Sequence, residues 1–291
     1  MHTEPFYLSY IPLLIRLQCC ESVQLPPYLG STLHGVVGWK LSEHSPEAYR
    51  YLFENRRYGG GKQDIVNPYI LEVPRSRRVY QQGDVLDFRI LLIGDALRYV
   101  GDVVGALTQD AWFELGAQRK KFRMMDIIQA DQLEPIWRLG TLHMDGAIPE
   151  RLTAWQQEEA MRCSIHFLTP LRIRRGGVLI RELDFPTIIR NITRRVEALA
   201  ERYGGYVNPD AAATVNELSG DVKQTSSGLF WYDLKRYSNR RNTKMDLSGL
   251  LGAMTFEGDL TIFAPWLHAA RVLHIGRNVT FGCGQVEVGL Y

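Results

Sequence analysis

The stretch Leu273-His274-Ile275-Gly276-Arg277-Asn278-Val279-Thr280-Phe281-Gly282-Cys283-Gly284-Gln285 lies between two patterned segments near the C-terminus. An apolar segment with helical spacing, residues 266–273, precedes it, and an alternating segment typical of a strand, residues 285–290, follows it. Glycine permits positive φ and close approach of a ligand to the backbone. Successive backbone N–H groups in such a loop can bind a phosphate. The sequence therefore predicts either an anion-binding loop or a plain glycine-rich turn from helix to strand.

Outward from this stretch, the same order of elements occurs in both halves of the chain. The first half predicts strands at 13–19, 69–73, 85–93 and 122–128 and helices at 28–41 and 94–108. The second half predicts strands at 161–167, 229–234, 254–263 and 286–290, helices at 184–203 and 265–273, and a polar loop at 206–228. Glycines 30, 35 and 38 weaken the first helix, and we expect a neighbour to pack closely against its backbone there.

Each half thus has the order β-α-β-β-α-β, which is the split βαβ or ferredoxin-like arrangement. The sequence predicts an α+β fold of two tandem ferredoxin-like (βαββαβ, RRM-like) domains, residues 1–145 and 146–291. Proline and glycine accumulate between about residues 131 and 158, where we place the boundary.

Composition is that of an ordinary globular protein, with 291 residues of which 45% are hydrophobic and 23% charged. No apolar run is long enough for a membrane span, and Met1–Glu4 does not begin a signal peptide. The four cysteines, Cys19, Cys20, Cys163 and Cys283, form no C-x-x-C pair. We expect reduced and mostly buried thiols in a cytoplasmic protein without a metal site.

Charge is clustered although the net charge is only +2. Basic residues gather at 75–78, 119–123, 172–175 and 235–244. Each cluster alone is compatible with a solvated surface, but four of them in predicted loops favour a basic track for nucleic acid.

Four segments carry a family resemblance: Pro27–Gly35, Phe167–Arg172, Arg236–Arg240 and the glycine-rich Leu273–Gly284. With the two predicted domains, their order resembles the RAMP superfamily of CRISPR-associated proteins. Within it, the chain is similar to the pre-crRNA-processing endoribonucleases of the Cas-six group. Many relatives carry arginine at the position of His34, so the resemblance leaves the catalytic position open.

The resemblance implies a metal-independent endoribonuclease that cleaves CRISPR repeat RNA in pre-crRNA. The RNA's own 2′-hydroxyl attacks the phosphorus, which leaves a cyclic phosphate and a 5′-hydroxyl. This reaction needs a base, an acid and a cation, but no cofactor, and the sequence shows no convincing metal-ligand cluster. The implied partners are repeat RNA or crRNA and other CRISPR effector subunits, with neither membrane nor DNA.

His34 is the first candidate for proton transfer, because histidine titrates near neutrality and the resemblance places a histidine on this helix. Lys40 follows six residues later, a spacing that some relatives share, although on a regular helix this offset of about 240° does not place the two residues on one face. The long lysine side chain, or a helix that ends early, could still bring them together. Tyr28 could orient the 2′-hydroxyl or stack on a base, and His274 lies beside the glycine-rich loop. The alternatives are structural: a polar helix residue at His34, apolar packing at Tyr28, and a histidine favoured by the helix C-terminus at His274.

RNA binding is predicted for the basic and glycine-rich segments of the second half, with aromatic residues that could stack on bases. The candidates are Arg172, Arg174, Arg175, Arg236, Tyr237, Arg240, Arg241, Lys244, Gly276, Arg277, Gly282 and Gly284. A solvated surface, or core packing for the aromatic residues, is the alternative.

Two other functions compete with RNA cleavage. A RAMP subunit could bind crRNA in a CRISPR effector complex without cutting it, and the presence of a histidine within reach of the scissile phosphate separates these two functions. A plain ferredoxin-like nucleotide-binding domain would leave the dispersed basic clusters unexplained.

Overall fold

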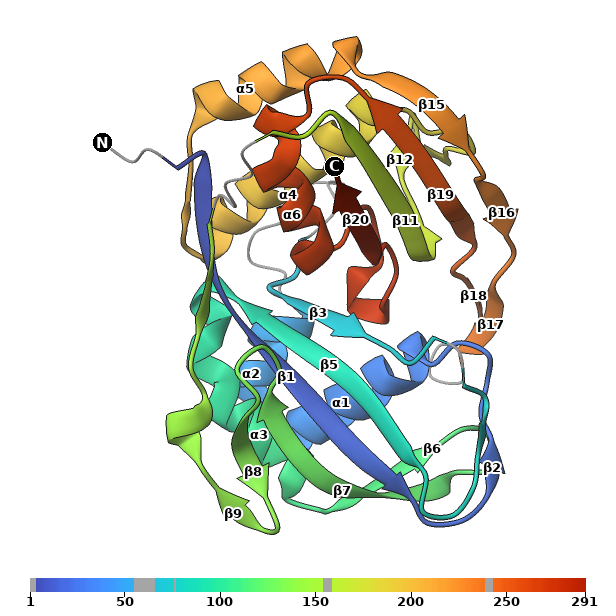
Figure 1. Cartoon of the computed structure of the whole chain (residues 1–291). Coiled ribbons are helices and arrows are strands. Elements are labelled where there is room, and N and C mark those ends of the chain that lie inside the picture. The colour runs from blue at the N-terminus through green and yellow to red at the C-terminus, as the bar shows by residue number, and fades with distance from the viewer. Residues whose placement is uncertain (1–3, 55–65, 76, 154–158, 239–242) are drawn as a thin grey trace. The chain divides into compact units, whose positions relative to one another are not determined.

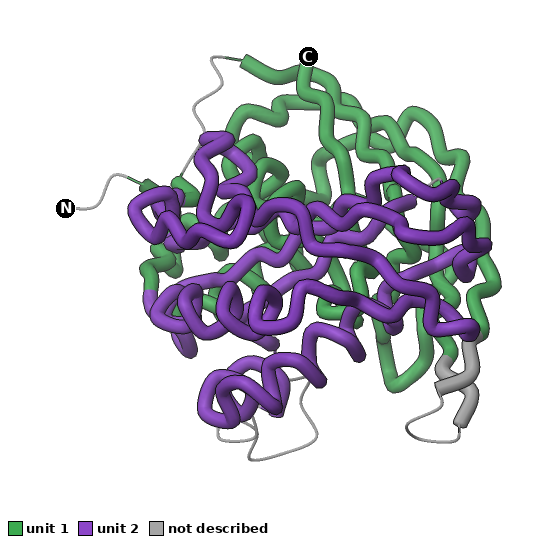
Figure 2. Tube along the Cα trace, turned by 90° about the horizontal axis from the view of Figure 1, so that it is seen from below, with its two compact units in different colours: residues 1–7, 152–200, 205–291 green, residues 8–151, 201–204 purple. Residues whose placement is uncertain are grey.

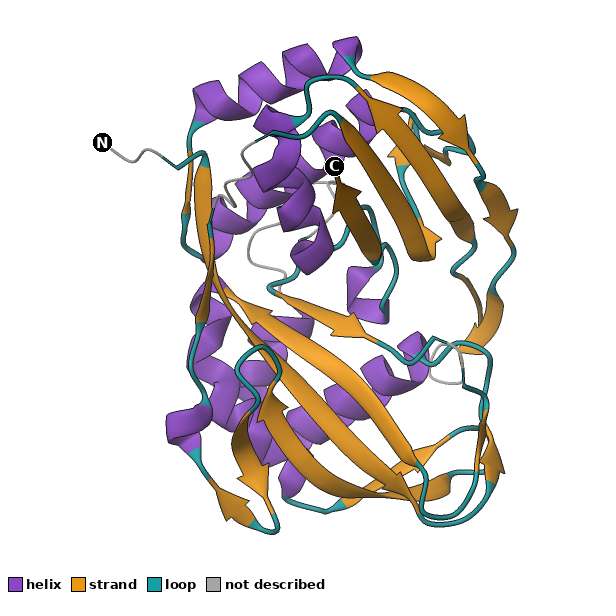
Figure 3. Cartoon of the chain, viewed as in Figure 1, coloured by secondary structure: helices purple, strands orange, loops and turns teal. Residues whose placement is uncertain are grey.

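The chain divides into two units, each with its own sheet. The structure is a computed structural model that describes residues 4–54, 66–75, 77–153, 159–238 and 243–291, without the side chains of residues 236–245. Unit 1 contains residues 1–7, 152–200 and 205–291, and unit 2 contains residues 8–151 and 201–204 (Figure 2). The chain contains both helices and strands (Figure 3), and each unit has elements of both kinds.

Unit 2 carries a sheet of antiparallel strands in the order β3-β5-β1-β7-β8-β9. The unit contains the strands β1 (Phe6–Cys19), β2 (Val23–Gln24), β3 (Tyr69–Glu72), β4 (Val79–Tyr80), β5 (Val85–Ile93), β6 (Trp112–Leu115), β7 (Lys120–Gln129), β8 (Glu134–Arg138), β9 (Thr141–Leu142) and β10 (Glu150–Leu152). Its helices are α1 (Gly30–His44), α2 (Pro46–Tyr49) and α3 (Val100–Thr108), with a π-helical turn at Arg50–Glu54 and 3₁₀ turns at Gly94–Tyr99 and Met144–Gly146. The path β7-β1-β5-β3 is the strand order of a ferredoxin-like sheet.

The core of unit 2 lies between this sheet and helices α1 and α3, which cover one face of it (Figure 1). Strand β1 buries every second side chain from Ile11 to Cys19, because alternate side chains of a strand point to opposite faces. Arg16 and Gln18 lie on the other face, where Arg16 forms an ion pair with Asp87. The alternation predicted from the sequence therefore places the first helix over the buried face.

Unit 1 has the same ferredoxin-like order in a sheet β15-β19-β11-β20, again antiparallel. The unit contains the strands β11 (Arg162–Leu171), β12 (Arg174–Arg175), β13 (Val178–Leu179), β14 (Tyr206–Val207), β15 (Lys223–Ser227), β16 (Phe230–Tyr232), β17 (Lys235–Ser238), β18 (Thr243–Asp246), β19 (Gly249–Glu257) and β20 (Val286–Leu290). Its helices are α4 (Phe185–Tyr203), α5 (Pro209–Leu218) and α6 (Ala264–Leu273), with 3₁₀ turns at Ser219–Asp221, Thr261–Phe263 and Val279–Phe281. The last three residues of α4, 201–203, group with unit 2, as does Gly204 after the helix.

Helix α4 shows why the periodic sequence pattern predicts this helix accurately. Asp184 accepts a hydrogen bond at Oδ1 from the N–H of Thr187, 2.8 Å away, and so caps the first turn. Ile189, Ile192 and Val196 are fully buried on one side of the helix. The predicted helix at 184–203 is confirmed almost to the residue.

The α+β fold with tandem ferredoxin-like units is confirmed, but three local expectations were wrong. Residues 206–228 contain α5 and β15 instead of a loop, and β17 and β18 form an unexpected hairpin. Asn208 explains α5, since its Oδ1 accepts the N–H groups of Asp210 and Ala211 and Pro209 occupies the first helical position. Strand β19 ends at Glu257 rather than near residue 263. Among the described residues, no helix is long and apolar enough to cross a membrane.

Candidate functional site

His34 lies on α1 with its side chain half-buried, and its Nδ1 is within hydrogen-bond distance of another side chain. Its Nδ1 is 3.1 Å from the hydroxyl oxygen of Tyr69, the first residue of β3. Tyr69 is only 1% exposed. The two rings stack with an angle of 17° and centroids 6.3 Å apart. The first candidate for proton transfer is therefore oriented through a buried phenol.

Phe53 packs into the same group of rings. Its ring centroid lies 5.0 Å from that of His34 and 4.8 Å from that of Tyr69. A Cβ at Gly38 would lie 2.7 Å from the Phe53 ring, so glycine at this position lets the ring rest against the helix. The close packing expected for the glycines of α1 is thus found at Gly38 but not at Gly35, where a Cβ would meet nothing within 4 Å. Phe53 contacts the imidazole from a second side. We call His34, Phe53 and Tyr69 the imidazole group.

Lys40 belongs to a different environment from His34. Its side chain is buried, and Nζ donates to the backbone oxygen of Asp110 at 3.0 Å and lies 3.6 Å from a carboxylate oxygen of that residue. The ammonium also lies 4.6 Å from the ring centroid of Phe113. Burial lowers the pKa of Lys40, although Asp110 opposes this shift. These contacts favour a structural role over the catalytic one expected from spacing.

The other two catalytic candidates also have structural surroundings. Tyr28 packs, half-buried, against the core of unit 2. His274 is fully buried in unit 1, and its Nδ1 lies 3.2 Å from the backbone oxygen of Cys283. It ends α6 with a φ of 58°. A fully buried imidazole cannot meet RNA in this conformation, so the structural alternative is favoured for His274.

The glycine-rich loop closes on itself. The N–H of Ile275 donates to the oxygen of Gly284 at 2.9 Å. Gly276, Gly282 and Gly284 all have φ between 73° and 81°. A Cβ at Gly284 would lie 1.8 Å from the oxygen of Ile275, which only glycine avoids. The glycines therefore serve this backbone contact first.

The loop is also joined to the end of β11. Gly284 N–H donates to the oxygen of Pro170 at 3.1 Å, and Arg277 N–H donates to the oxygen of Arg172 at 2.8 Å. Gln285 N–H donates to Oγ1 of Thr169 at 2.9 Å. These N–H groups have protein acceptors, so they serve the helix-to-strand turn. Phosphate binding by other amides of the loop stays a prediction from the sequence.

Arg172 links this loop to the start of β19. Its Nε donates to Oδ1 of Asn278 at 3.0 Å, and its guanidinium also donates to the backbone oxygen of Ser248. The Arg172 side chain is buried, and Oδ1 of Asp246 lies 3.8 Å from its Nη1. The guanidinium predicted to bind RNA is thus largely occupied within unit 1.

The β12–β13 hairpin presents a better cationic surface. Arg174 and Arg175 are exposed on β12, and the turn is formed by Gly176 and Gly177. Arg175 donates to Thr187 Oγ1 at 2.9 Å. Just after β13, the Arg181 guanidinium lies 4.4 Å from the ring centroid of Trp231. Arginine–aromatic pairs of this kind are suited to stacking on bases.

The remaining predicted binding residues belong to the β17–β18 segment and to the glycine-rich loop. Arg240 and Arg241 lie outside the described residues. Arg236, Tyr237 and Lys244 lie on the β17–β18 hairpin, but their side chains are outside the described part of the chain. The side chain of Arg277 is half-buried in the glycine-rich loop.

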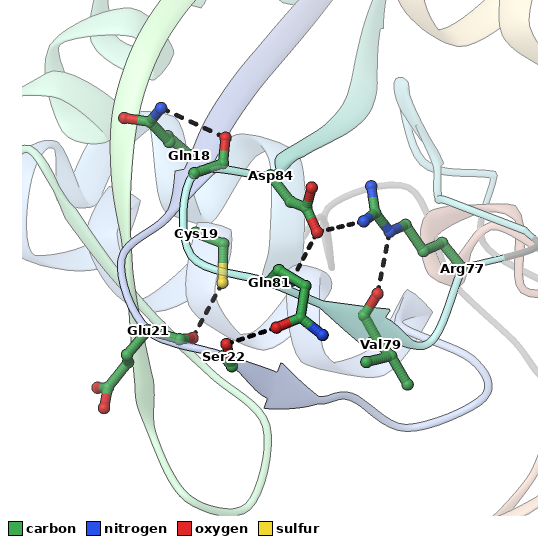
Figure 4. A network of polar contacts seen from close by, with 9 residues as sticks. Gln18, Cys19, Glu21, Ser22, Arg77, Val79, Gln81 and Asp84 are labelled. Carbon is green, nitrogen blue, oxygen red and sulfur yellow. Dashed lines mark hydrogen bonds and ion pairs between the residues drawn. The ribbon is translucent and has the colours of Figure 1, made fainter.

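The basic clusters of unit 2 are partly neutralised. Figure 4 shows Arg77 paired with the carboxylate of Asp84, which also accepts the N–H of Gln81. In the cluster at 119–123, Nε of Arg119 lies 3.0 Å from a carboxylate oxygen of Glu114, and Nζ of Lys120 lies 2.6 Å from a carboxylate oxygen of Glu21. These ion pairs weaken the expectation of a basic track running through all four clusters.

Sequence reasoning missed Tyr69, Phe53 and Arg181. Tyr69 lies in a short apolar strand, so the sequence pattern indicates a core residue, and Tyr69 is indeed buried. Arg181 lies outside the counted clusters. Within the described residues, no group of three or more His, Cys, Asp or Glu side chains is placed to hold a metal ion.

The family comparisons divide the chain as the fold does. Residues 165–286 match the family model described as CRISPR-associated endoribonuclease Cas6, and residues 8–149 match a model described as an N-terminal domain. A comparison with curated proteins gave no match.

Solved structures share the fold along nearly the whole chain. A Thermus thermophilus Cas6 in a product complex has a TM-score of 0.61 at 17% identity, over 96% of this chain and 100% of that one. A second Cas6 product complex has a TM-score of 0.59 at 19% identity, over 97% and 99%. A partial Cas6-RT-Cas1–Cas2 complex has a TM-score of 0.63 at 12% identity, over 99% of this chain and 47% of that one. The second half of this chain is thus similar to the Cas6 endoribonucleases, and its tandem ferredoxin-like units share the fold of the solved Cas6 structures.

Proposed function

We propose that this chain is an endoribonuclease that cleaves CRISPR repeat RNA without a metal ion. The 2′-hydroxyl beside the scissile phosphate attacks the phosphorus, the 5′ oxygen leaves, and the products carry a cyclic phosphate and a 5′-hydroxyl. The Cas6 family match supports RNA cleavage in general. The observation that carries the residue assignment is His34, half-buried on α1 and oriented by Tyr69.

His34 would transfer a proton in this reaction. Histidine is suited to this because its ordinary pKa is about 6.5, so both protonation states are available near pH 7. As a base it takes the proton of the 2′-hydroxyl, and as an acid it gives one to the leaving 5′ oxygen. Among the solved Cas6 structures is one of a mutant with a histidine replaced by alanine. The contacts of Lys40 and His274 make His34 the preferred residue.

Unit 1 would bind the RNA. Exposed Arg174 and Arg175, with the Arg181–Trp231 pair, offer phosphate contacts and a stacking surface. The β17–β18 hairpin, with Arg236, Tyr237 and Lys244, and the following Arg240 and Arg241 stay in this proposal as predictions from the sequence. Other CRISPR proteins are proposed partners, since a related fold occurs in a Cas6-RT-Cas1–Cas2 complex. We keep the expectation that DNA is not a substrate.

The test is cleavage of an end-labelled CRISPR repeat RNA in EDTA, followed on a denaturing gel. We expect one cut with a cyclic phosphate, and a single-turnover rate at least 100-fold lower in His34→Ala, because general acid–base catalysis contributes about 10²–10⁴-fold. RNA affinity should stay within about threefold, since proton transfer does not require binding energy from this side chain.

His44→Ala is the matched control, because His44 is an exposed histidine in the last turn of the same helix, bonded to Gln109. It should cut like the wild type. Near wild-type cleavage by His34→Ala would refute the assignment of His34. Tight binding without any cut by the wild type would instead support the non-catalytic crRNA-binding subunit.

A further inference from the structure

The imidazole group bears on which nitrogen of His34 reacts. A neutral imidazole has one N–H donor and one acceptor nitrogen, and the partner of one nitrogen determines the role of the other. Nδ1 of His34 faces the Tyr69 hydroxyl at 3.1 Å, on a strand residue that is 1% exposed. We propose that Tyr69 is a positioning residue whose hydroxyl oxygen accepts the Nδ1–H of His34, which makes Nε2 the nitrogen that exchanges protons with RNA.

The direction of this hydrogen bond follows from the two states that proton transfer requires. If Nδ1–H donates to Tyr69, the neutral ring has a basic Nε2 and the cation has an acidic Nε2–H, so the same contact persists in both states. If Tyr69 donated to Nδ1 instead, protonation of the ring would reverse the bond and the phenol hydrogen would have to turn away, because an imidazolium has no acceptor nitrogen. Only the first direction keeps the same donor and acceptor through the reaction.

The surrounding rings make this orientation rigid. Tyr69 stacks on the imidazole at 17°, and Phe53 packs against both rings. Tyr69 itself is held in the antiparallel pair with Leu92 of β5. A ring fixed before RNA arrives needs no reorganisation when the proton moves, and small displacements of a catalytic group can cost orders of magnitude in rate. Both the reaction at Nε2 and the direction of the hydrogen bond rest on the proposed function, whereas the 3.1 Å contact between Nδ1 and the Tyr69 hydroxyl does not.

The first measurement is made on the free protein, without RNA. Protein labelled with ¹⁵N in its histidine rings gives long-range ¹H–¹⁵N spectra in which a protonated and an unprotonated ring nitrogen have distinct shifts. His34→Ala identifies the His34 signals. Above the pH at which the ring becomes neutral, we expect Nδ1 to carry the proton in the wild type and the Nε2–H form to predominate in Tyr69→Phe.

The second measurement is single-turnover cleavage across pH. Tyr69→Phe keeps the ring and removes the hydroxyl, so we expect a rate at least 10-fold lower, a displaced pH–rate profile and RNA affinity within twofold. Tyr80→Phe is the matched control, because Tyr80 is also 1% exposed in unit 2 but its ring packs on Phe122. It should alter neither the His34 tautomer nor the pH–rate profile, and melting curves of both variants verify folding.

The outcomes separate the two proposals. An Nε2–H tautomer in the wild type, or the same tautomer in wild type and Tyr69→Phe, overturns the role of Tyr69. So does cleavage by Tyr69→Phe at the wild-type rate and pH profile. If the tautomer depends on Tyr69 but the wild type cuts no repeat RNA, the proposed function fails while the His34–Tyr69 hydrogen bond stands.

Discussion

The ammonium of Lys40 is buried in unit 2, but its partner Asp110 remains half-exposed. The methylene stem packs in the core, and the ammonium lies over Phe113. An apolar side chain of similar length would keep most of this packing. Loss of the ammonium would leave the Asp110 carboxylate in water, where an unpaired charge costs little.

We therefore expect Lys40→Met to change the free energy of unfolding by less than about 1.5 kcal/mol and Lys40→Ala to lower it by about 2 kcal/mol more. Urea unfolding at pH 7 measures both. Lys40→Met should also retain RNA cleavage. If its cleavage rate fell 100-fold with an unchanged urea midpoint, the catalytic role expected from the sequence would replace the structural one.

The lowered pKa of Lys40 adds a pH dependence to the same comparison. Between the folded-state pKa and the ordinary value of about 10.4, the unfolded chain binds this proton more tightly than the folded one. Stability therefore gains from rising pH in that window. Lys40→Met should lack this contribution, so the difference in stability between it and the wild type should change in favour of the wild type as the pH rises.

At the scale of elements, the glycine-rich loop has a function in folding that its composition alone does not reveal. Gly284 has a φ of 73°, and a Cβ there would overlap the oxygen of Ile275. Gly177, in the β12–β13 turn, has a similar φ of 82°, but a Cβ added there would meet no atom within 4 Å. The two positions therefore separate the cost of positive φ from the cost of a clash.

We expect Gly177→Ala to lower the free energy of unfolding by about 1 kcal/mol, as positive φ costs a non-glycine residue. Gly284→Ala should lower it by at least about 3 kcal/mol, because the closed loop must also open. Urea unfolding followed by tryptophan fluorescence measures both. A Gly284→Ala protein that kept its stability but lost RNA affinity would support the anion-binding interpretation of this loop.

Local pattern predicts the elements whose boundaries depend on local signals. Strands β5 and β20 have the expected bounds, and α4 begins at its Asp184 cap. Strand β19 also begins at Gly249 rather than near residue 254, and this difference has a long-range cause. Gly252 has a φ of 118° and lets the Gly228 backbone approach to where a Cβ would stand, which the sequence around residue 252 does not show. Helix α5 could have been found, since Asn208 and Pro209 form an ordinary start signal.

The candidate site shows the same division. His34 is a candidate from residue type and resemblance alone, but its partner Tyr69 is 35 residues away on another element. The Lys40 expectation relied on spacing within one helix, and its actual contacts come from the segment at residues 110–113. Contacts between distant segments decide which candidate is presented to a ligand, and no local pattern contains them.

At the scale of the whole molecule, the small net charge is unevenly placed. Unit 2 has 18 Lys and Arg against 18 Asp and Glu, whereas unit 1 has 16 against 14, which together give the 34 and 32 of the chain. Unit 2 also pairs several of its arginines with acids, as in Arg16–Asp87 and Arg138–Asp126. Electrostatic attraction of RNA should therefore come mainly from unit 1.

The dependence of RNA affinity on salt tests this assignment. Each phosphate contact adds about 0.7–0.9 to the slope of log K against log salt. Replacing Arg174 and Arg175 together by glutamine should make the slope less steep by about 1.5, because both are exposed on the β12–β13 hairpin. The control is the double glutamine variant of Arg119 and Arg138, whose guanidiniums already contact Glu114 and Asp126 in unit 2. Its slope should match the wild type. Equal slopes for all three proteins would remove the hairpin from the RNA-binding surface, whereas a less steep slope only in the control would place the phosphate contacts in unit 2.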